Sequence, residues 1–338
     1  MHAAGVEWMG PLFVMAGAVS MAGTWLARRS ALARSMLDRP NSRSLHTVPT
    51  PRGGGIAIAV GWCLAIGVWA LAAGGDGASL AAALLPPAAA VAAIGWWDDH
   101  TSLPARWRLA VHLAAAAWAV WALEPAWLTE VPGARMAVSV VAVVALAWSI
   151  NLYNFMDGVD GLAGAEAVFV ALAASALVGP TSVVFVPLLT LAAASAGFLA
   201  FNWPPARIFM GDAGSCFLGF ALGGLLLGAS IEGTLPLPAA VVLMGAFVVD
   251  ATVTLGVRAL RAERLYQAHR HHAYQHWARR TRAHRPVTVA VMAINGFWLL
   301  PMAAWASYRP DIAVGIAALA LAPLVIVVLL SGAGRPED

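Results

Sequence analysis

Long apolar stretches separated by short polar segments extend along the whole sequence. They cover about residues 8–27, 54–74, 80–97, 109–127, 135–153, 162–179, 182–201, 214–230, 236–257, 287–307 and 311–331. A helix needs ~20 apolar residues to cross a bilayer, and it satisfies its backbone hydrogen bonds internally, as that solvent requires. The pattern therefore predicts an all-α polytopic membrane protein with ten to eleven transmembrane helices, folded as one integral membrane domain over residues 1–338.

The composition excludes several other classes of protein. Hydrophobic residues make up 61% of the chain and charged residues 11%, against ~25% charged residues in soluble domains. A soluble globular domain, a disordered chain and a coiled coil are thereby excluded, and no nucleic-acid partner is expected. The chain contains no lysine, so a catalytic or P-loop lysine is excluded as well. Cys63 and Cys216 lie in apolar stretches and are expected to be free thiols.

The arginines predict the orientation in the membrane. When the segments between apolar stretches are assigned alternately to the two sides, eighteen of the twenty basic residues fall on one side. Basic residues concentrate on the cytoplasmic side of membrane proteins. The N-terminus is therefore expected outside and the C-terminus in the cytoplasm, as an odd number of helices requires.

The polar chemistry lies in the same inner segments, at residues 38–58, 96–108, 151–166, 202–215 and 258–285. Asp98 and Asp99 adjoin each other where an apolar run ends. Two neighbouring carboxylates at a membrane interface repel each other and are costly to desolvate. A divalent cation would relieve both costs, and Mg²⁺ favours a few carboxylates together with substrate phosphates and water.

Further carboxylates follow at regular spacing. Asn154, Asp157 and Asp160 recur every three residues, which on a helix places them within an arc of roughly 120°. They are expected to face one pocket unless the nearby glycines end the helix. Asp212 comes just before an apolar run and is expected to be the N-cap of that helix, where an anion is favoured.

Basic side chains point to phosphate binding. Arg43, His46 and Arg52 precede a run of three glycines, and together they suggest a clamp that faces phosphate. The fifth segment carries His269, His271, His272 and His276. These histidines allow a metal cluster, donors to phosphate oxygens or a solvated basic helix. Phosphate donors are favoured over a metal cluster, because no nearby acid or cysteine completes a metal site.

Phosphoryl transfer at the cytoplasmic membrane surface fits these groups best, because carboxylates hold Mg²⁺ while Mg²⁺, Arg and His hold phosphates. The main alternative is a membrane transporter of an anionic or nucleotide-sugar substrate. A transporter would be expected to place ionisable groups near the bilayer midplane, whereas here they gather at helix ends. A non-catalytic membrane scaffold would leave the clustered aspartates without a purpose.

Five strings in this order carry a family resemblance: PTPRGGG, DDHTSL, NLYNFMDGVDGLAG, FNWPPARIFMGDAGS and AHRHHAYQH. The chain resembles the polyprenyl-phosphate N-acetylhexosamine-1-phosphate transferase superfamily, glycosyltransferase family 4, which includes undecaprenyl-phosphate N-acetylglucosamine-1-phosphate transferases and phospho-N-acetylmuramoyl-pentapeptide transferases. The resemblance implies a UDP-N-acetyl amino sugar donor, an undecaprenyl phosphate acceptor and release of UMP. It also implies Mg²⁺, with Mn²⁺ as an alternative ion, and the bacterial inner membrane with the site facing the cytoplasm. The product would be the lipid-linked first sugar of a cell-surface polysaccharide.

The resemblance also implies roles for individual residues. Asp98, Asp99, Asp157, Asp160 and Asp212 would be catalytic, with Asp212, Asp98 and Asp99 at the metal and Asp98 as the candidate base. The substrate-binding residues would be Arg43, His46, Arg52, Asn154, Asn202, Phe209, His269, His271 and His272. Within these sets, Asn154, Asp157 and Asp160 would line the nucleotide pocket, with Asp160 near the uracil. Asn202 and Phe209 would lie on the uridine side, and His271 and His272 would face the diphosphate.

The chain departs from the pentapeptide-transferase pattern because it has no lysine near the first two motifs, and it looks closer to the O-antigen-initiating branch. The donor sugar, N-acetylglucosamine or a 6-deoxy amino sugar, stays open. The pathway and homodimerisation stay open as well.

Overall fold

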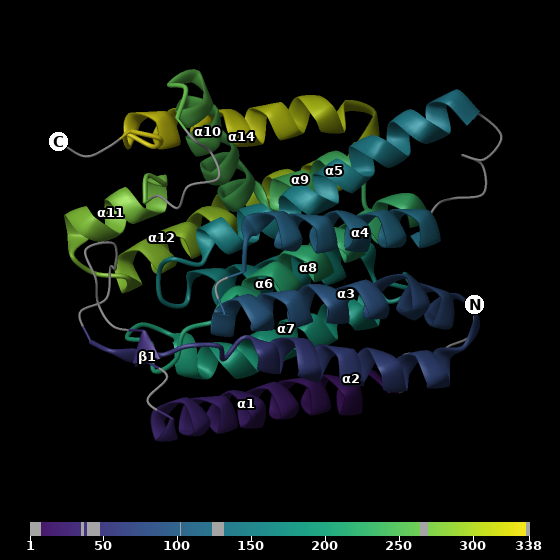
Figure 1. Ribbon diagram of the computed structural model, residues 1–338. Coiled ribbons are helices and arrows are strands. Elements are labelled where there is room, and N and C mark those ends of the chain that lie inside the picture. Colours follow the sequence, from purple (N-terminus) through teal and green to yellow (C-terminus); the bar gives the residue numbers. More distant parts are fainter. Residues whose placement is uncertain are drawn as a thin grey trace.

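The structure is a bundle of helices that lie mostly side by side (Figure 1). This computed structural model describes residues 8–34, 37–38, 48–101, 103–123, 132–263 and 270–335. The chain enters the bundle at one end through α1 and completes its last helix, α14, at the opposite end (Figure 1). The helices are α1 (Met9–Ala33), α2 (Ile56–Ala73), α3 (Gly75–Thr101), α4 (Ala105–Leu123), α5 (Pro132–Met156), α6 (Leu162–Val178), α7 (Phe185–Asn202), α8 (Asp212–Glu232), α9 (Leu237–Leu243), α10 (Gly245–Leu260), α11 (Ala273–Thr281), α12 (Arg285–Ile294), α13 (Leu300–Tyr308) and α14 (Ala313–Leu330).

Shorter elements complete the chain. A π-helical turn, Asn295–Leu299, joins α12 to α13, and a 3-10 turn, Pro310–Ile312, precedes α14. The strands β1 (Leu37–Asp38) and β2 (Thr50–Pro51) pair antiparallel, with Leu37 opposite Pro51.

The predicted all-α membrane fold is confirmed, and each predicted apolar run is mostly helical in its described part. Within the described residues, eight helical segments are long and apolar enough to cross a membrane, or nine with a bent pair. The predicted count of ten to eleven also includes α4 and α6. Arg106, Arg108 and His112 make α4 more polar. With 17 residues, α6 rises about 26 Å, somewhat less than the ~30 Å hydrocarbon core.

One predicted span is broken. The sequence predicts a single helix over 236–257, but α9 and α10 meet at an angle of 82°. Gly245 begins the second half, where an added Cβ would lie 2.8 Å from Cδ2 of Leu321. The backbone thus turns in close contact with α14, and α10 runs across the direction of the other helices (Figure 1).

Helix α8 forms the centre of the bundle and is buried along most of its length. Small residues allow its neighbours to approach, as in other membrane helix interfaces. An added Cβ at Gly219 would lie 2.5 Å from the carbonyl oxygen of Ser149 in α5. An added Cβ at Gly214 would lie 2.6 Å from Cα of Gly55, just before α2. This packing holds the N-terminus of α8 against the ends of α2 and α3.

The close approach at Gly95 of α3 is testable. A Cβ there would lie 2.5 Å from the carbonyl oxygen of Asp212, whereas one at Gly67 of α2 would meet nothing within 4 Å. We expect Gly95→Ala to destabilise the protein by about 1–3 kcal/mol, as overpacking does. Gly67→Ala, the control, removes only a helix-breaking glycine and is expected to be neutral or slightly stabilising. Thermal unfolding in detergent, followed by tryptophan fluorescence, measures both; equal shifts in Tm would contradict the packing described here.

Candidate active site

Three carboxylates meet where α3 ends and α8 begins. Asp98 and Asp99 lie near the C-terminus of α3, and Asp212 is the first residue of α8. Nη1 of Arg108, from α4, lies 2.7 Å from Oδ2 of Asp98 and 2.6 Å from Oδ2 of Asp212. Asp98 also accepts the backbone N–H of Leu103 at 2.5 Å. A single guanidinium thus bridges two of the predicted catalytic aspartates.

Asp99 caps α8 from another helix. Its Oδ1 accepts the N–H of Asp212 at 3.0 Å, and its Oδ2 accepts the N–H of Ala213 at 3.2 Å. The prediction that Asp212 is the N-cap is wrong: Gly211 holds that position and Asp212 follows it. Gly211 has φ +78°, and an added Cβ would lie 2.6 Å from Oδ2 of Asp99. Glycine therefore permits the cap, because it accepts this conformation and leaves room for the carboxylate.

The first inner segment lies along the fourth. Phe209 donates its N–H to the carbonyl of Pro51 at 2.8 Å, and Gly54 donates to the carbonyl of Phe209 at 3.0 Å. This pairing brings Arg52 to Asp99, where its guanidinium donates to the backbone carbonyl and lies 3.9 Å from Oδ1. The Arg52 side chain is 43% exposed and that of Asp99 is 5% exposed. Arg52 is thus an accessible cation at the edge of the aspartate cluster.

The carboxylate of Asp157 differs from the other predicted catalytic carboxylates in its lack of a partner among the described residues. Helix α5 ends at Met156, so Asp157 and Asp160 lie in the following turn and not on one helical face as predicted. Among the described residues, no cation or hydrogen-bond donor contacts the Asp157 carboxylate. Burial, followed by the charges of Asp212, Asp99 and Asp160, raises the pKa of Asp157 well above its usual value.

Asn154 and Asn202 hold segments of the site together. Asn154 donates from Nδ2 to Oγ of Ser215 at 3.0 Å, which ties α5 to α8. Asn202 is buried; it accepts the N–H of Gly161 at 3.0 Å and donates to the carbonyl of Ile208 at 2.9 Å.

Asp160 ties the same segments to α12. Its Oδ2 accepts the N–H of Ala206 at 2.9 Å, and its Oδ1 lies 3.0 Å from Nδ1 of His284. Thr288 also donates to the backbone carbonyl of Asp160 at 2.9 Å. Asp160 and Asn202, both predicted on the nucleotide side, are thus fully engaged in joining loops, while Phe209 beside them is half-buried.

The histidine segment packs against the end of α5. His272 is buried, with Nδ1 3.1 Å from Oδ1 of Asp250 and its ring stacked on Phe155 at 6.2 Å. His271 is half-buried. Burial lowers the pKa of His271; Glu263 opposes this shift and the nearby Arg258 adds to it. Within the described part of the chain, no three His, Cys, Asp or Glu residues are grouped to hold a metal ion. Arg43, His46 and His269 lie outside the described residues.

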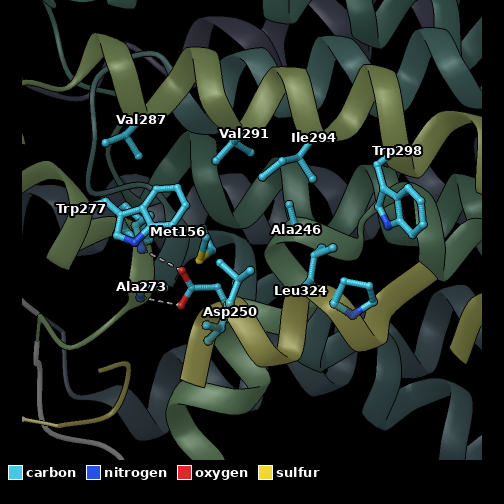
Figure 2. Close-up of a pocket in the computed structure, with 14 residues that line it drawn as sticks. Met156, Ala246, Asp250, Ala273, Trp277, Val287, Val291, Ile294, Trp298 and Leu324 are labelled. Carbon is cyan, nitrogen blue, oxygen red and sulfur yellow. Dashed lines mark hydrogen bonds between the residues drawn. The ribbon is translucent and has the colours of Figure 1, made fainter. Parts of the chain in front are cut away.

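An apolar groove of about 330 Å³ opens beside this segment, between α10, α11, α12 and α14. Figure 2 shows Val291 and Ile294 along one side, Leu324 along the other and Trp298 at one end. Met156, the residue before Asp157, also lines it. The groove therefore reaches the end of α5, one residue before Asp157.

Sequence reasoning missed several residues that the fold brings into the site. Arg108 lies in the segment 96–108, where the sequence pattern indicates only a basic residue on the inner side of the membrane. His284, Ser215 and Asp250 come from elements distant along the chain from their partners. For these three, no local spacing signals the contact.

Comparison with known proteins places this site in a family. The model of glycosyl transferase family 4 matches residues 80–230, which run from α3 to α8. The chain is 28% identical over 284 residues, 81% of its length and 78% of the relative's, to a probable undecaprenyl-phosphate N-acetylglucosaminyl 1-phosphate transferase of Bacillus subtilis (strain 168).

Two other relatives match over less than two thirds of their own lengths. One is a phospho-N-acetylmuramoyl-pentapeptide-transferase of Chlamydia pneumoniae, 33% identical over 54% of this chain and 62% of the relative. The other is a decaprenyl-phosphate N-acetylglucosaminephosphotransferase of Mycolicibacterium smegmatis, 30% identical over 62% of this chain and 57% of the relative. Residues 80–230 therefore match glycosyl transferase family 4, and the relatives that the chain resembles are polyprenyl-phosphate N-acetylglucosamine-phosphate transferases and phospho-N-acetylmuramoyl-pentapeptide transferases.

Proposed function

We propose that this protein transfers an N-acetylhexosamine 1-phosphate from a UDP-sugar to undecaprenyl phosphate and releases UMP. The bridge from Asp98 through Arg108 to Asp212, beside the unengaged carboxylate of Asp157, carries the proposal. The named relatives, which act on polyprenyl phosphates, support it. The transporter alternative is not supported, because the relatives are transferases and the aspartates gather at helix ends.

The reaction exchanges one diphosphate bond for another. An oxygen of the acceptor phosphate attacks the phosphorus that carries the sugar, and the bond from that phosphorus to the oxygen of UMP breaks. The second pKa of a phosphate monoester is about 6, so the acceptor is largely dianionic at pH 7 and needs little help from a base. Asp98, which already accepts two hydrogen bonds, then serves mainly to orient Arg108 toward the phosphates.

Charge neutralisation is the greater requirement. Arg108 and the accessible Arg52 are the described cations at the aspartate cluster, and both suit a diphosphate. The apolar groove next to Met156 offers the acceptor's hydrocarbon chain a surface that leads to Asp157. Arg43 and His46 remain proposed phosphate contacts from the first inner segment.

The carboxylates fit a magnesium ion. Asp157 has no partner among the described residues, and like charges with burial raise its pKa, so a cation would be favoured there. Asp98 uses both carboxylate oxygens, for Leu103 and Arg108, and Asp99 uses both for the N-terminus of α8, whereas Arg108 bonds Asp212 through Oδ2 alone. We therefore propose Asp157 and Asp212 as the residues that hold Mg²⁺, or Mn²⁺ in its place. When bound, the ion would offset the negative charge of the donor diphosphate.

The protein is a bacterial multi-pass membrane protein, as its helices and relatives indicate. We propose the inner membrane, with the aspartate site facing the cytoplasm, on the basis of the arginine distribution. In support, β1 and α11 lie at the same end of the bundle, where α14 ends (Figure 1).

Arg108 provides the first test. We expect Arg108→Gln to lower kcat for UMP release by about 100-fold or more, because a preorganised cation is lost from the charged site. Arg106→Gln is the matched control, since Arg106 is exposed and packs on Trp107 one residue away. It should stay within about two-fold of the wild type, as surface changes usually do. Retention of most activity by a folded Arg108→Gln protein would contradict the proposal.

Asp157 provides the second test. Chelation should abolish UMP release, and Asp157→Asn should raise the Mg²⁺ concentration for half-maximal activity about tenfold or more. Because the pKa of Asp157 is raised, protons compete with the ion, so the wild-type Mg²⁺ requirement should fall as pH rises. The Asn variant should lose this pH dependence.

Asp160→Asn is the control for this titration. Its side chain joins loops and lies outside the proposed metal site, so the Mg²⁺ requirement should change much less than in Asp157→Asn, even where stability falls. An unaltered Mg²⁺ requirement in Asp157→Asn would remove Asp157 from the metal site.

Cysteines placed at the two exposed ends of α3 test the orientation of the protein in the membrane. In a protein lacking Cys63 and Cys216, a cysteine in place of Thr101 lies at the aspartate end and one in place of Asp76 at the other. We expect a membrane-impermeant thiol reagent to label Thr101→Cys only in inverted vesicles. Asp76→Cys should react only in right-side-out vesicles. The reverse pattern would place the site outside the cell.

A further inference from the structure

The side chain of Asp250, in α10, is 6% exposed and accepts four hydrogen bonds. Three of the donors belong to the histidine segment: Nδ1 of His272 at 3.1 Å, the N–H of Ala273 at 3.0 Å and the N–H of Tyr274 at 3.0 Å. The fourth is the hydroxyl of Thr254, one turn further along α10, at 3.0 Å. The carboxylate therefore contacts each of residues 272, 273 and 274 by a hydrogen bond.

The apolar surroundings of Asp250 require that its carboxylate be hydrogen-bonded. Among the described residues that line the apolar groove, Asp250 is the one charged residue, and Figure 2 shows it at the groove wall with dashed lines to the start of α11. A buried carboxylate is tolerated only when it is well hydrogen-bonded. Displacement of residues 272–274 would remove three of the four hydrogen-bond donors to the Asp250 carboxylate. The position of this segment and the burial of the Asp250 charge are therefore energetically coupled.

Asp250 also supports α11 itself. This helix has nine residues, too few to be stable alone, and its first N–H groups need acceptors. Asp250 supplies them to Ala273 and Tyr274 from another helix, while Oε1 of Gln275 accepts the N–H of His272 at 3.3 Å. The position of the N-terminus of α11 is thus set by α10.

The other side of the same segment faces the active site. The hydroxyl of Tyr274 donates to the carbonyl of Phe155 at 2.8 Å, and the ring of His272 stacks on that of Phe155. Phe155 lies between Asn154 and Asp157. Residues 272–274 therefore lie between Asp250 and the last turn of α5, directly before Asp157.

We propose that Asp250 is a positioning residue for the transfer reaction, which holds His271 and His272 against the Asp157 turn; this inference rests on the proposed function. Since an ionised carboxylate only accepts hydrogen bonds, Nδ1 of His272 carries the proton. Asp250 thereby fixes the tautomer of His272 as well as the backbone that presents His271. Asp250 itself does not touch the substrate.

Kinetics distinguish this role from simple stabilisation of α11. In Asp250→Asn, one carboxylate oxygen becomes an NH₂ donor, so the N–H of Tyr274 loses its acceptor and the remaining neutral oxygen holds Nδ1 of His272 more weakly. We expect kcat for UMP release to fall about 100-fold, the effect of a small misplacement in a reacting site, with the donor KM changed by less than about three-fold. Thr254→Val removes the donor outside the histidine segment, and Gln275→Ala removes the side chain that accepts the N–H of His272 but leaves Asp250 in place; both should keep kcat within about two-fold while lowering Tm.

A double-mutant cycle tests whether Asp250 acts through His272. The double variant Asp250→Asn/His272→Gln should have a kcat no lower than that of the slower single variant. When two residues act as a unit, the second substitution causes no further loss of activity. Multiplied losses, or a kcat for Asp250→Asn near that of the wild type, would overturn the proposal. So would a loss of kcat in Gln275→Ala equal to that in Asp250→Asn.

A spectroscopic measurement keeps this inference separate from the proposed function. In protein labelled with ¹⁵N-histidine, the signal absent from His272→Gln identifies His272. It should report a protonated Nδ1 in the wild type and a different state in Asp250→Asn, whether or not UMP is released. An unchanged signal would overturn the contact between Asp250 and His272, whereas a wild-type protein inactive with UDP-sugars would overturn only the proposed function.

Discussion

Negative charge gathered at a membrane surface must be compensated, and at the junction of α3 and α8 this requirement organises the structure. Asp98 and Asp212 would repel each other across that junction, but Nη1 of Arg108 lies within hydrogen-bond distance of both. Asp99 is compensated differently, by the two N–H groups that begin α8. The positive end of the α8 dipole adds to both interactions. The charges of the site therefore come from α3, α4 and α8. Each of these helices supplies a group that compensates a charge on another.

Close packing around α8 fixes the distances between these charged groups. Backbone atoms of α2, α3 and α5 approach α8 at glycines where a Cβ would not fit, including Gly55, Gly95 and Gly219. A bilayer provides little hydrophobic force between helices, so such contacts are a main source of helix association. The same small residues that hold the bundle together thus bring Asp99 close enough to cap α8.

The second half of the site depends on a helix that departs from the bundle. The 82° bend between α9 and α10 carries Asp250 under the histidine segment, where its carboxylate receives donors from residues 272–274. A straight span would have continued through the bilayer and carried Asp250 away from this position. The bend therefore links the apolar groove, the histidines and the turn at Asp157 in one continuous set of contacts.

Much of this protein follows from its sequence alone. Length and hydropathy of the apolar runs predict the helices, because the bilayer requires ~20 apolar residues for each span. The inner segments, with Asp98, Asp99, Asp157 and Asp212, stand out because acids so close to apolar runs are costly without a function. The motif strings in those segments carry the family resemblance that the comparisons confirm. These are local properties, and a single sequence displays them.

Only the tertiary structure decided which groups neutralise, cap and orient one another. Asp99 replaces Asp212 as the cap of α8 across 113 positions of the chain, and His284 reaches Asp160 across 124. The end of α5 at Met156 and the break at Gly245 depend on packing against α11 and α14, which hydropathy does not report. Hydrogen bonds and ion pairs act over a few ångströms in space, whatever the separation along the chain. The sequence therefore determined the kinds of chemical group at this membrane surface, and the fold determined their partners.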